Sequence, residues 1–321
     1  MYAIYVESSQ QRGMGHLFRA LNFTAYLREI GEKYIVFIND DAISINILNR
    51  QQIPYYVLGN EVEKGNLISD VIRNFSIDVI LLDRFSTSFE VCSLLKKQNI
   101  LLAAIDDCGT GATLLDIHFC SMLFENLKGK HILKGKEFLI LNSEIQKYRR
   151  IRTKVDKILV TLGGSDTYGV TVKVIRILKK LNYKADIIIG PHFKFHQELM
   201  NELDEGFNVF SNVESLIYTF SMYDLAITGG GVTCIEASAS GLPCLIVANE
   251  LHEIDIARYV ASFGGAIYLG YHQELNKRDF ILHNLDIKQM SEKALQAFEL
   301  NGAANIYRAI EERRKRWKKK W

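Results

Sequence analysis

The sequence has little proline and no closely paired cysteines. Only three of its 321 residues are proline, whereas 48% are hydrophobic and 24% are charged. This balance is typical of a folded globular chain and excludes a disordered or collagen-like one. The five cysteines are odd in number and include no C-x-x-C pair, which argues against a disulfide framework and a structural zinc site. The length suffices for about two domains, each with its own buried core.

Long hydrophobic runs are also missing. Apolar stretches such as residues 100–105 are far shorter than the ~18 residues that a membrane-spanning helix needs. The first residues lack the basic flank and apolar core of a signal peptide. We therefore expect a cytoplasmic protein.

Charge of either sign is nearly balanced, with 39 Lys and Arg against 37 Asp and Glu. Seven of the cations lie in residues 313–320, so the rest of the chain has 32 basic against 37 acidic residues. This mildly acidic body argues against nucleic-acid binding. The tail 313–321 combines its cations with two tryptophans, which suits an anionic membrane surface. A peripheral contact with the inner membrane face and a solvated helix end are the two interpretations of the tail.

Short apolar runs alternate with helix-length amphipathic segments along the chain. Runs of buried-strand length occupy residues 3–6, 34–38, 79–82, 101–105, 157–162, 185–190, 225–228 and 244–247. Helical patterns between them, such as 170–181 and 232–240, predict an α/β protein with parallel strands. The series restarts after the basic segment 144–154. We therefore predict two Rossmann-like domains, 1–150 and 151–321, with a basic C-terminal helix in the second.

A glycine pair follows the first predicted strand. It belongs to the motif Gly13-Met14-Gly15-His16-Leu17-Phe18-Arg19, which precedes the amphipathic segment 20–30. Glycines here let a ligand approach the backbone, and the N-terminus of the following helix offers free N–H groups to an anion. A dinucleotide-binding fingerprint needs a small residue where Phe18 stands, which disfavours NAD binding.

His16 is the titratable residue of this loop. An imidazole there could take a proton near neutral pH, and we predict that His16 is catalytic, with a capping role as the alternative. Gly13, Gly15 and Arg19 are predicted to contact the substrate. For Arg19, orientation of the loop from the helix face is the alternative.

Two glycine-rich segments of the second half fit phosphate binding. Gly163, Gly164 and Ser165 follow a predicted strand, although an ordinary strand-to-helix turn has the same letters. The run of residues 229–233, between a strand and a helix, presents N–H donors and a helix dipole to a diphosphate. Glu236, one turn later, could accept hydrogen bonds from a ribose diol. The predicted nucleotide-binding residues are Gly163, Gly164, Ser165, Gly230, Gly231, Val232, Thr233 and Glu236.

These motifs resemble known families. The segment from Gly229 to Pro243, G-G-G-x-T-x-x-E-A-x-x-x-G-x-P, resembles the nucleotide-binding half of glycosyltransferase family 28 and other GT-B proteins. Residues 7–19, together with Leu82-Asp83-Arg84-Phe85, Ile105-Asp106-Asp107 and Gly163-Gly164-Ser165-Asp166, resemble the PseG family. That family comprises UDP-2,4-diacetamido-2,4,6-trideoxy-β-L-altropyranose hydrolases and related spore-coat polysaccharide proteins. The resemblance covers roughly residues 1–270.

The resemblance implies a GT-B-like fold, with two Rossmann-like parallel-sheet domains facing a cleft. The N-terminal domain would hold the sugar and the C-terminal domain UDP. It also implies an inverting, metal-independent hydrolase of pseudaminic-acid-like surface-glycan biosynthesis, without a cofactor. His16 would be the general base that activates water at the anomeric carbon and so expels UDP. Glu7 and Asp83 match acidic positions of the family and would orient the sugar or the imidazole.

Some positions depart from the family pattern. Tyr5 stands where the family has arginine, and Phe85 stands where it has tyrosine. Asn249 or His252 could take the place of an Asn-Gln pair that contacts the sugar or phosphate, and both are predicted to bind substrate. These departures keep two alternatives open: a GT-B glycosyltransferase that uses a UDP-sugar donor, and a non-catalytic sugar-nucleotide-binding subunit.

Overall fold

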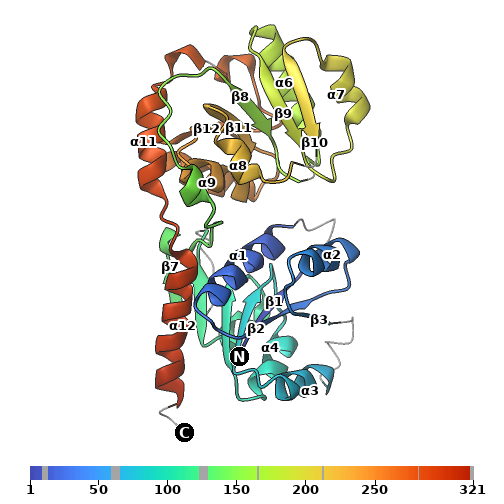
Figure 1. Ribbon diagram of the computed structural model, residues 1–321, viewed down its shortest axis with the longest axis vertical. Coiled ribbons are helices and arrows are strands. Elements are labelled where there is room, and N and C mark those ends of the chain that lie inside the picture. The colour runs from blue at the N-terminus through green and yellow to red at the C-terminus, as the bar shows by residue number, and fades with distance from the viewer. Residues whose placement is uncertain are drawn as a thin grey trace. The chain divides into compact units, whose positions relative to one another are not determined.

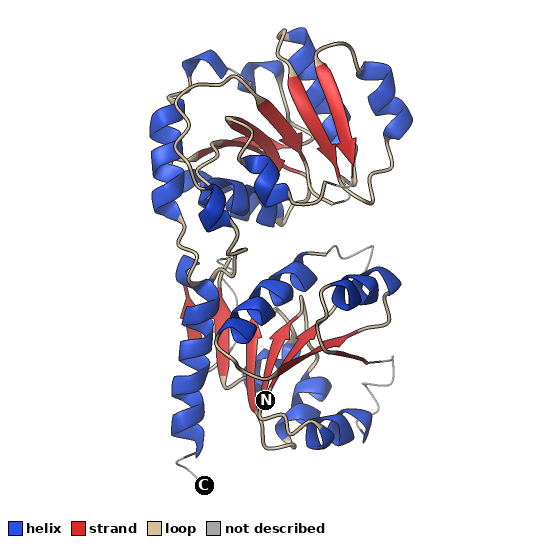
Figure 2. Cartoon of the chain, viewed as in Figure 1, coloured by secondary structure: helices blue, strands red, loops and turns tan. Residues whose placement is uncertain are grey.

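The computed structural model describes residues 1–8, 14–58, 66–122, 129–164, 166–211, 213–280 and 282–318. The chain divides into two compact units, the first made of residues 1–141 and 301–321 and the second of residues 142–300. Each unit is a parallel β-sheet covered by helices (Figures 1 and 2), so the predicted α/β class with two parallel sheets is confirmed.

The first unit contains a seven-stranded sheet. Its strands are β1 (Tyr2–Val6), β2 (Tyr34–Ile38), β3 (Tyr55–Val57), β4 (Val79–Asp83), β5 (Leu101–Ile105), β6 (Ile117–Cys120) and β7 (Ile132–Lys134). They are all parallel, in the order β3-β2-β1-β4-β5-β6-β7. Strands β1, β4 and β5 are buried along their whole length, as expected for central parallel strands with helices on both faces.

Helices connect these strands and close the unit. They are α1 (Gly15–Glu29), α2 (Ala42–Arg50), α3 (Asn66–Asn74), α4 (Phe89–Lys96), the 3₁₀ helices η2 (Thr110–Leu114) and η3 (Lys136–Phe138), and α12 (Gly302–Lys318). The apolar face of α1 is buried through Leu17, Phe23 and Leu27, which fixes the helix that carries His16 against the sheet.

Helix α12 lies far along the chain from the first sheet but packs on it (Figure 1). Ile306 and Ile310 are fully buried in the core of the first unit, and the Tyr2 hydroxyl donates to Glu311 Oε1 at 2.6 Å. The sequence analysis assigned this helix to the second domain and placed the boundary near residue 150. The structure instead divides the chain after Leu141, because the apolar stripe of α12 completes the first core.

The basic tail begins within α12. Arg314 is bound in ion pairs with Asp78 and Glu311, whereas Lys315 and Arg316 are exposed. Residues 319–321 and the side chains of residues 317 and 318 lie outside the described part of the chain. None of the helices that the structure describes is long and apolar enough to cross a membrane.

The second unit contains a six-stranded sheet. Its strands are β8 (Ile158–Thr161), β9 (Ala185–Ile189), β10 (Phe207–Ser211), β11 (Leu225–Gly229), β12 (Cys244–Ala248) and β13 (Ala266–Tyr271). They too are parallel, in the order β10-β9-β8-β11-β12-β13. The helices are α5 (Ile145–Tyr148), α6 (Val170–Lys180), α7 (His196–Glu202), α8 (Leu216–Phe220), α9 (Val232–Ala239), α10 (Glu253–Ser262), η4 (Lys277–Asp279), η5 (Leu282–Asn284) and α11 (Ile287–Ala297).

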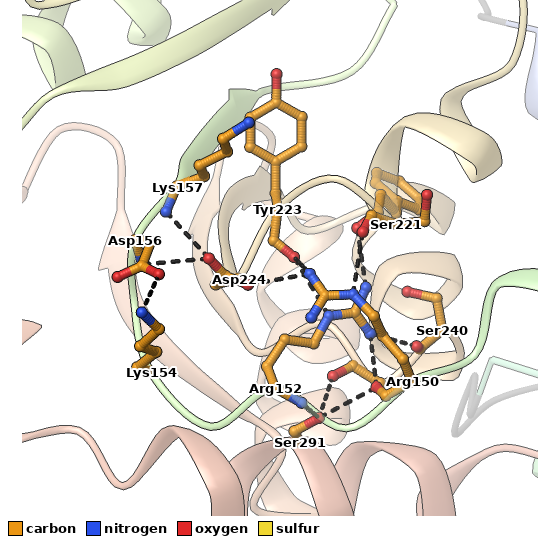
Figure 3. Close-up of polar contacts among 12 residues, drawn as sticks. Arg150, Arg152, Lys154, Asp156, Lys157, Ser221, Tyr223, Asp224, Ser240 and Ser291 are labelled. Carbon is orange, nitrogen blue, oxygen red and sulfur yellow. Dashed lines mark hydrogen bonds and ion pairs between the residues drawn. The ribbon is translucent and has the colours of Figure 1, made fainter.

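A buried arginine anchors the segment that leads into the second sheet (Figure 3). Arg152 is fully buried and donates to the carbonyl oxygens of Phe220 at 2.8 Å and Ser240, which end α8 and α9. Helix C-termini carry partial negative charge, which suits a buried cation. Burial, and next the charge of Arg150, lower the pKa of Arg152 to about 9. Arg150 donates to the carbonyl of Ser221, directly after α8, and pairs with Asp224, both at 3.0 Å, so two arginines fix the end of α8 to this segment.

Candidate functional site

Each sheet reverses its strand order at one point. In parallel α/β sheets, ligands bind at the carboxyl ends of the strands where the order reverses. In the first sheet this point lies between β1 and β4. The predicted residue Glu7 directly follows β1, and the predicted residue Asp83 is the last residue of β4. In the second sheet it lies between β8 and β11, which lead into the two glycine-rich segments. The predicted residues therefore gather at one reversal point in each unit.

His16 and Asp83 form a close pair in the first unit. Nδ1 of His16 lies 2.7 Å from Oδ1 of Asp83, the last residue of β4. The Asp83 side chain is only 1% exposed, whereas that of His16 is 22% exposed. A carboxylate at Nδ1 holds the proton there and leaves Nε2 as the proton acceptor. The sequence analysis placed His16 in a loop; the structure places it in the first turn of α1, because the buried Leu17 already belongs to the helix.

Arg19 holds Asp83 from the next turn of α1. Its Nε donates to Asp83 Oδ2 and its Nη1 to Asp106 Oδ2, both at 2.8 Å. Burial alone would raise the pKa of Asp83, but the Arg19 guanidinium and His16 outweigh it and lower this pKa to about 2. The Arg19 guanidinium is buried between these two aspartates, an arrangement that suits the alternative role of orientation from the helix face. Contact of Arg19 with the substrate stays a prediction.

Asp106 extends this network to the next loop. Its carboxylate accepts from the backbone N–H of Ser121 at 2.7 Å and from the Ser121 hydroxyl at 2.5 Å. Its neighbour Asp107 accepts from the N–H groups of Thr87 at 2.9 Å and Gly109 at 2.8 Å. Asp106 belongs to the family motif quoted above but is not among the predicted catalytic or binding residues. The available signal was two adjacent carboxylates directly after a buried strand.

A second cluster lies at the ends of β1 and β4. Glu7 Oε2 accepts from Arg84 Nη2 at 3.3 Å, and the Arg84 guanidinium lies 4.6 Å from the centre of the Tyr5 ring. The Tyr5 ring is therefore covered by an arginine that directly follows the neighbouring strand β4. Phe85, which follows Arg84, is 56% exposed.

Gly15 of the first motif directly begins α1. Among the described residues, no atom lies within 4 Å of a Cβ placed on Gly15, so on that side the backbone at the start of α1 is open to a ligand. Within the same part of the chain, no side chain caps this helix terminus. Gly13 lies outside the described residues.

The first glycine segment of the second unit is open, but the helix after it is capped. Gly163 has φ +89°, and a Cβ on Gly163 or Gly164 would meet no atom of the described residues within 4 Å. The Asp166 carboxylate accepts from the N–H groups of Val170 at 2.7 Å and Thr171 at 2.8 Å. The N-terminus of α6 is therefore occupied by a carboxylate of the chain itself. Ser165 lies outside the described residues.

In the part of the chain that the structure describes, no side chain caps helix α9 in this way. Its N-cap residue, Gly231, offers no side chain, and a Cβ placed there would approach only Glu253 Oε1, at 3.7 Å. The first N–H groups of α9, from Val232 and Thr233 onward, are therefore suited to an anion. Gly230 is different, because its N–H donates to Glu253 Oε2 at 3.2 Å and a Cβ would lie 2.7 Å from Glu253 O. Gly230 is required for packing, and its N–H is already used.

Unpartnered polar groups mark the same end of the second sheet. Glu236 is half-buried and has no hydrogen-bond or ion-pair partner among the residues that the structure describes, and burial raises its pKa to about 7. The buried atoms Thr228 Oγ1 and Asn249 Oδ1 also lack a partner in the described part of the chain. Leaving a buried polar group unsatisfied costs about 1–3 kcal/mol, which a ligand with matching groups would recover.

The two predicted residues after β12 differ in their surroundings. Asn249 is 5% exposed, and its side-chain amide donates to the Leu162 carbonyl at 3.1 Å, which joins the loops after β12 and β8. His252 is exposed and directly precedes α10. Within the described ranges, no group of three or more His, Cys, Asp or Glu residues is arranged to hold a metal ion.

No protein-family model matches the chain. An uncharacterized protein of Methanocaldococcus jannaschii, MJ1062, is 25% identical over 273 residues, which are 78% of this chain and 56% of that protein. The spore coat polysaccharide biosynthesis protein SpsG of Bacillus subtilis is 22% identical over 288 residues, which are 83% of each chain. The chain thus spans little more than half the length of the first of these relatives.

Solved structures resemble the whole chain. MurG of Acinetobacter baumannii has a TM-score of 0.69 at 15% identity, covering 97% of this chain and 99% of that one. The co-structure of S. aureus MnaA with UDP has a TM-score of 0.65 at 13% identity, covering 95% and 94%. With two parallel sheets in one chain, these similarities confirm the predicted GT-B-like fold.

Proposed function

We propose that the protein is an enzyme that acts on a UDP-sugar, with UDP bound by the second unit and His16 of the first unit as general base. The observation that carries this proposal is the 2.7 Å contact between His16 Nδ1 and the buried, ionised Asp83. Titratable residues with such a carboxylate partner at the reversal point of a parallel sheet are typical of catalytic sites.

The chemistry that this pair can perform is proton removal from a nucleophilic hydroxyl. Nε2 of His16 takes the proton while the nucleophile oxygen bonds to the anomeric carbon. The bond from that carbon to the diphosphate breaks, and UDP leaves with the electron pair. Asp83 stabilises the imidazolium that forms, and Arg19 keeps Asp83 in place. A single displacement of this kind inverts the anomeric carbon.

UDP binding is supported by the uncapped N-terminus of α9. Its first N–H groups, with the Thr233 hydroxyl beside them, would hold the diphosphate. The Glu236 carboxylate, which has no partner among the described residues, lies one turn further and would accept hydrogen bonds from the ribose diol. The open backbone at Gly163 and Gly164 would line the other side of the diphosphate. UDP is also the ligand in the co-structure of S. aureus MnaA, whose fold this chain shares.

Water is the proposed nucleophile, which makes the enzyme an inverting hydrolase of the PseG type. The sugar would be a UDP-linked diacetamido-trideoxy hexose, and the pathway that of a surface glycan. The name of SpsG, which links that protein to spore coat polysaccharide biosynthesis, is consistent with such a pathway. Neither a cofactor nor a metal has a step in this reaction.

The test is release of UDP without an acceptor. A panel of UDP-, CMP- and GDP-sugars, including the UDP-diacetamido sugar, is incubated with the wild type and with His16→Ala, and products are identified by mass spectrometry. We expect one UDP-sugar to yield UDP and free sugar, with a loss of roughly 10²–10⁴-fold in His16→Ala. Equal UDP release by the two proteins would exclude His16 as the base.

A glycosyltransferase is the second candidate, and Phe85 favours it. This ring is 56% exposed two residues after Asp83 and could support the apolar face of an acceptor larger than water. In that case UDP appears only when an acceptor is supplied. UDP binding without turnover in any acceptor screen would instead indicate a non-catalytic sugar-nucleotide-binding subunit.

A further inference from the structure

An aromatic stack lies at the carboxyl edge of the second sheet, beyond the glycine segments. The Tyr168 ring, from the loop between β8 and α6, stacks on the ring of His272, which directly follows β13. The ring centres are 4.5 Å apart and the planes differ by 13°. Tyr168 is 49% exposed, whereas His272 is 8% exposed. The stack therefore offers a flat, exposed ring that is backed by a buried one.

Hydrogen-bonding groups border this ring. The Tyr168 hydroxyl donates to Glu250 Oε2 at 3.3 Å, and Glu250 follows β12 with its side chain half-buried. His272 Nε2 is buried and has no partner within the described ranges, and the same holds for Oδ1 of Asn249, the neighbour of Glu250. A flat face beside a carboxylate and two unsatisfied polar atoms is a set of groups that suits a ligand with one apolar face and several hydrogen-bonding groups.

The charged side chains around the stack differ in whether they are already bound to other groups of the chain. The groups that act on His272 are Lys173, Glu250 and Asp166. The Lys173 ammonium donates to the His272 carbonyl, and the Asp166 carboxylate caps α6. Burial, and next the charge of Lys173, lower the pKa of His272, so its ring is neutral at neutral pH. Among the described residues, the side chain of Glu250 thus has a single bond, a long one to the Tyr168 hydroxyl.

We propose that Tyr168, His272 and Glu250 form the subsite for the sugar of the nucleotide-sugar, and that this subsite selects a sugar with hydroxyl or amide N–H groups over a uronic acid. The inference rests on the proposed function, because the glycine segments must hold UDP for its sugar to reach the stack. The C–H face of a pyranose packs on an aromatic ring, and a carboxylate accepts hydrogen bonds from sugar hydroxyls or amide N–H groups. A C6 carboxylate on the sugar meets the like charge of Glu250, which disfavours it.

The test compares ligands that differ in one group. Isothermal titration measures the binding of UDP, UDP-glucose and UDP-glucuronic acid, of which the last two differ only at C6. We expect the wild type to bind UDP-glucose at least about tenfold more tightly than UDP-glucuronic acid. Glu250→Gln is expected to reduce this ratio to about threefold or less, because the like charge is removed.

Variants of Tyr168 distinguish binding of the sugar from binding of the nucleotide. Tyr168→Ala is expected to weaken UDP-glucose binding about tenfold and to leave UDP binding unchanged, whereas Tyr168→Phe keeps the ring and most of the affinity. Tyr218→Ala, at an exposed tyrosine of α8, and Glu205→Gln, at an exposed carboxylate before β10, are matched controls with no expected effect.

The outcomes distinguish an error in the sugar subsite from an error in the proposed function. If the wild type binds the two sugars equally, or if Tyr168→Ala weakens UDP as much as UDP-glucose, the sugar subsite is wrong while UDP binding stands; in the second case the stack holds the nucleobase. If UDP itself does not bind, the proposed function fails and the subsite fails with it.

Discussion

Nδ1 of His16 lies 2.7 Å from a carboxylate oxygen of Asp83, although 67 positions separate the two residues in the sequence. The contact joins the first turn of α1 to the last residue of β4. Because Asp83 is held by Arg19 and Arg19 by Asp106, the orientation of the imidazole depends on residues from three segments of the first unit. The predictions below test this network and the proposed nucleotide site.

Asp83→Asn is expected to lower kcat for UDP release by roughly 10²–10⁴-fold with little change in KM. The side chain keeps its size but loses the charge that stabilises the imidazolium and holds the proton on Nδ1. Steady-state assays of UDP release check this. Asp70→Asn, in an exposed ion pair with Arg73, is the control and should behave as wild type. Wild-type kcat in Asp83→Asn would contradict the assignment of His16.

The same substitution tests stability in acid. The pKa of Asp83 is about 2, below the ordinary 3.8, so its ionised form stabilises the fold above about pH 4. That contribution is lost as the pH falls from about 4 through 2, where the folded state also takes the proton. Asp83→Asn should therefore be less stable than wild type by roughly 3 kcal/mol at neutral pH, because Arg19 loses a buried partner.

Urea denaturation at pH 7 and in steps down to pH 2 measures the difference in the free energy of unfolding between wild type and Asp83→Asn. This gap should narrow as the pH falls from about 4 to about 2. A gap that stays constant over the whole range would show that the Asp83 charge contributes nothing to folding.

Gly15 and Gly230 are expected to respond oppositely to alanine. A Cβ on Gly15 meets nothing within 4 Å, so Gly15→Ala should leave the free energy of unfolding nearly unchanged and raise KM by obstructing the ligand. A Cβ on Gly230 lies 2.7 Å from Glu253 O, so Gly230→Ala should destabilise the second unit by about 1–3 kcal/mol. Thermal denaturation and KM measurements on both variants separate the two roles. An unchanged KM in a stable Gly15→Ala would mean that no ligand approaches this backbone.

The raised pKa of Glu236 predicts that nucleotide binding depends on pH. Burial raises its pKa to about 7, and hydrogen bonds from a ribose diol favour the ionised carboxylate. Binding of UDP-glucose, whose diphosphate does not titrate near neutral pH, should tighten as the pH rises from about 6 to about 8. Glu236→Gln should remove this dependence. Titration calorimetry in buffers of different ionisation enthalpy measures the proton release; the same slope in both proteins would exclude Glu236 from the binding site.

The basic end of α12 can be tested without disturbing the fold. Arg314 must stay, because it pairs with Asp78 and Glu311, whereas Lys315 and Arg316 are exposed. Each such cation contributes about 1 kcal/mol to binding of an anionic membrane surface. If the tail binds such a surface, Lys315→Glu/Arg316→Glu should abolish cosedimentation with phosphatidylglycerol-containing vesicles and leave thermal stability unchanged. Equal sedimentation of both proteins would exclude the contact.

Much of the fold follows from local pattern. All eight predicted strands are present to within one residue at each end, because central parallel strands are continuous apolar runs such as residues 101–105. Five of the strands that the structure describes were not predicted, and three of them have weak signals. β3 and β7 have three residues each, and β10 mixes exposed polar and apolar positions because it lies at a sheet edge.

The residues of the candidate site were easier to predict than their partners. The glycine motifs located His16, Gly231 and Glu236, since composition and position along the strand carry that information. Arg19 binds two aspartates, and the Gly230 N–H donates to Glu253. Both interactions depend on contacts between segments that are distant in the sequence. No local pattern encodes such contacts, and for the same reason the stack of Tyr168 on His272 was missed.

The second unit is an insertion within the first. The chain leaves the first unit after Leu141 and re-enters it at Asn301, and Gly302 packs so tightly against the Leu139 carbonyl that a Cβ would collide with it. The outgoing and returning segments therefore pass side by side. One cut of the backbone cannot separate the halves: a truncation before α12 would strip Ile306 and Ile310 from the half that holds His16. Excising residues 142–300 and splicing the two neighbouring ends is the route to an isolated first half.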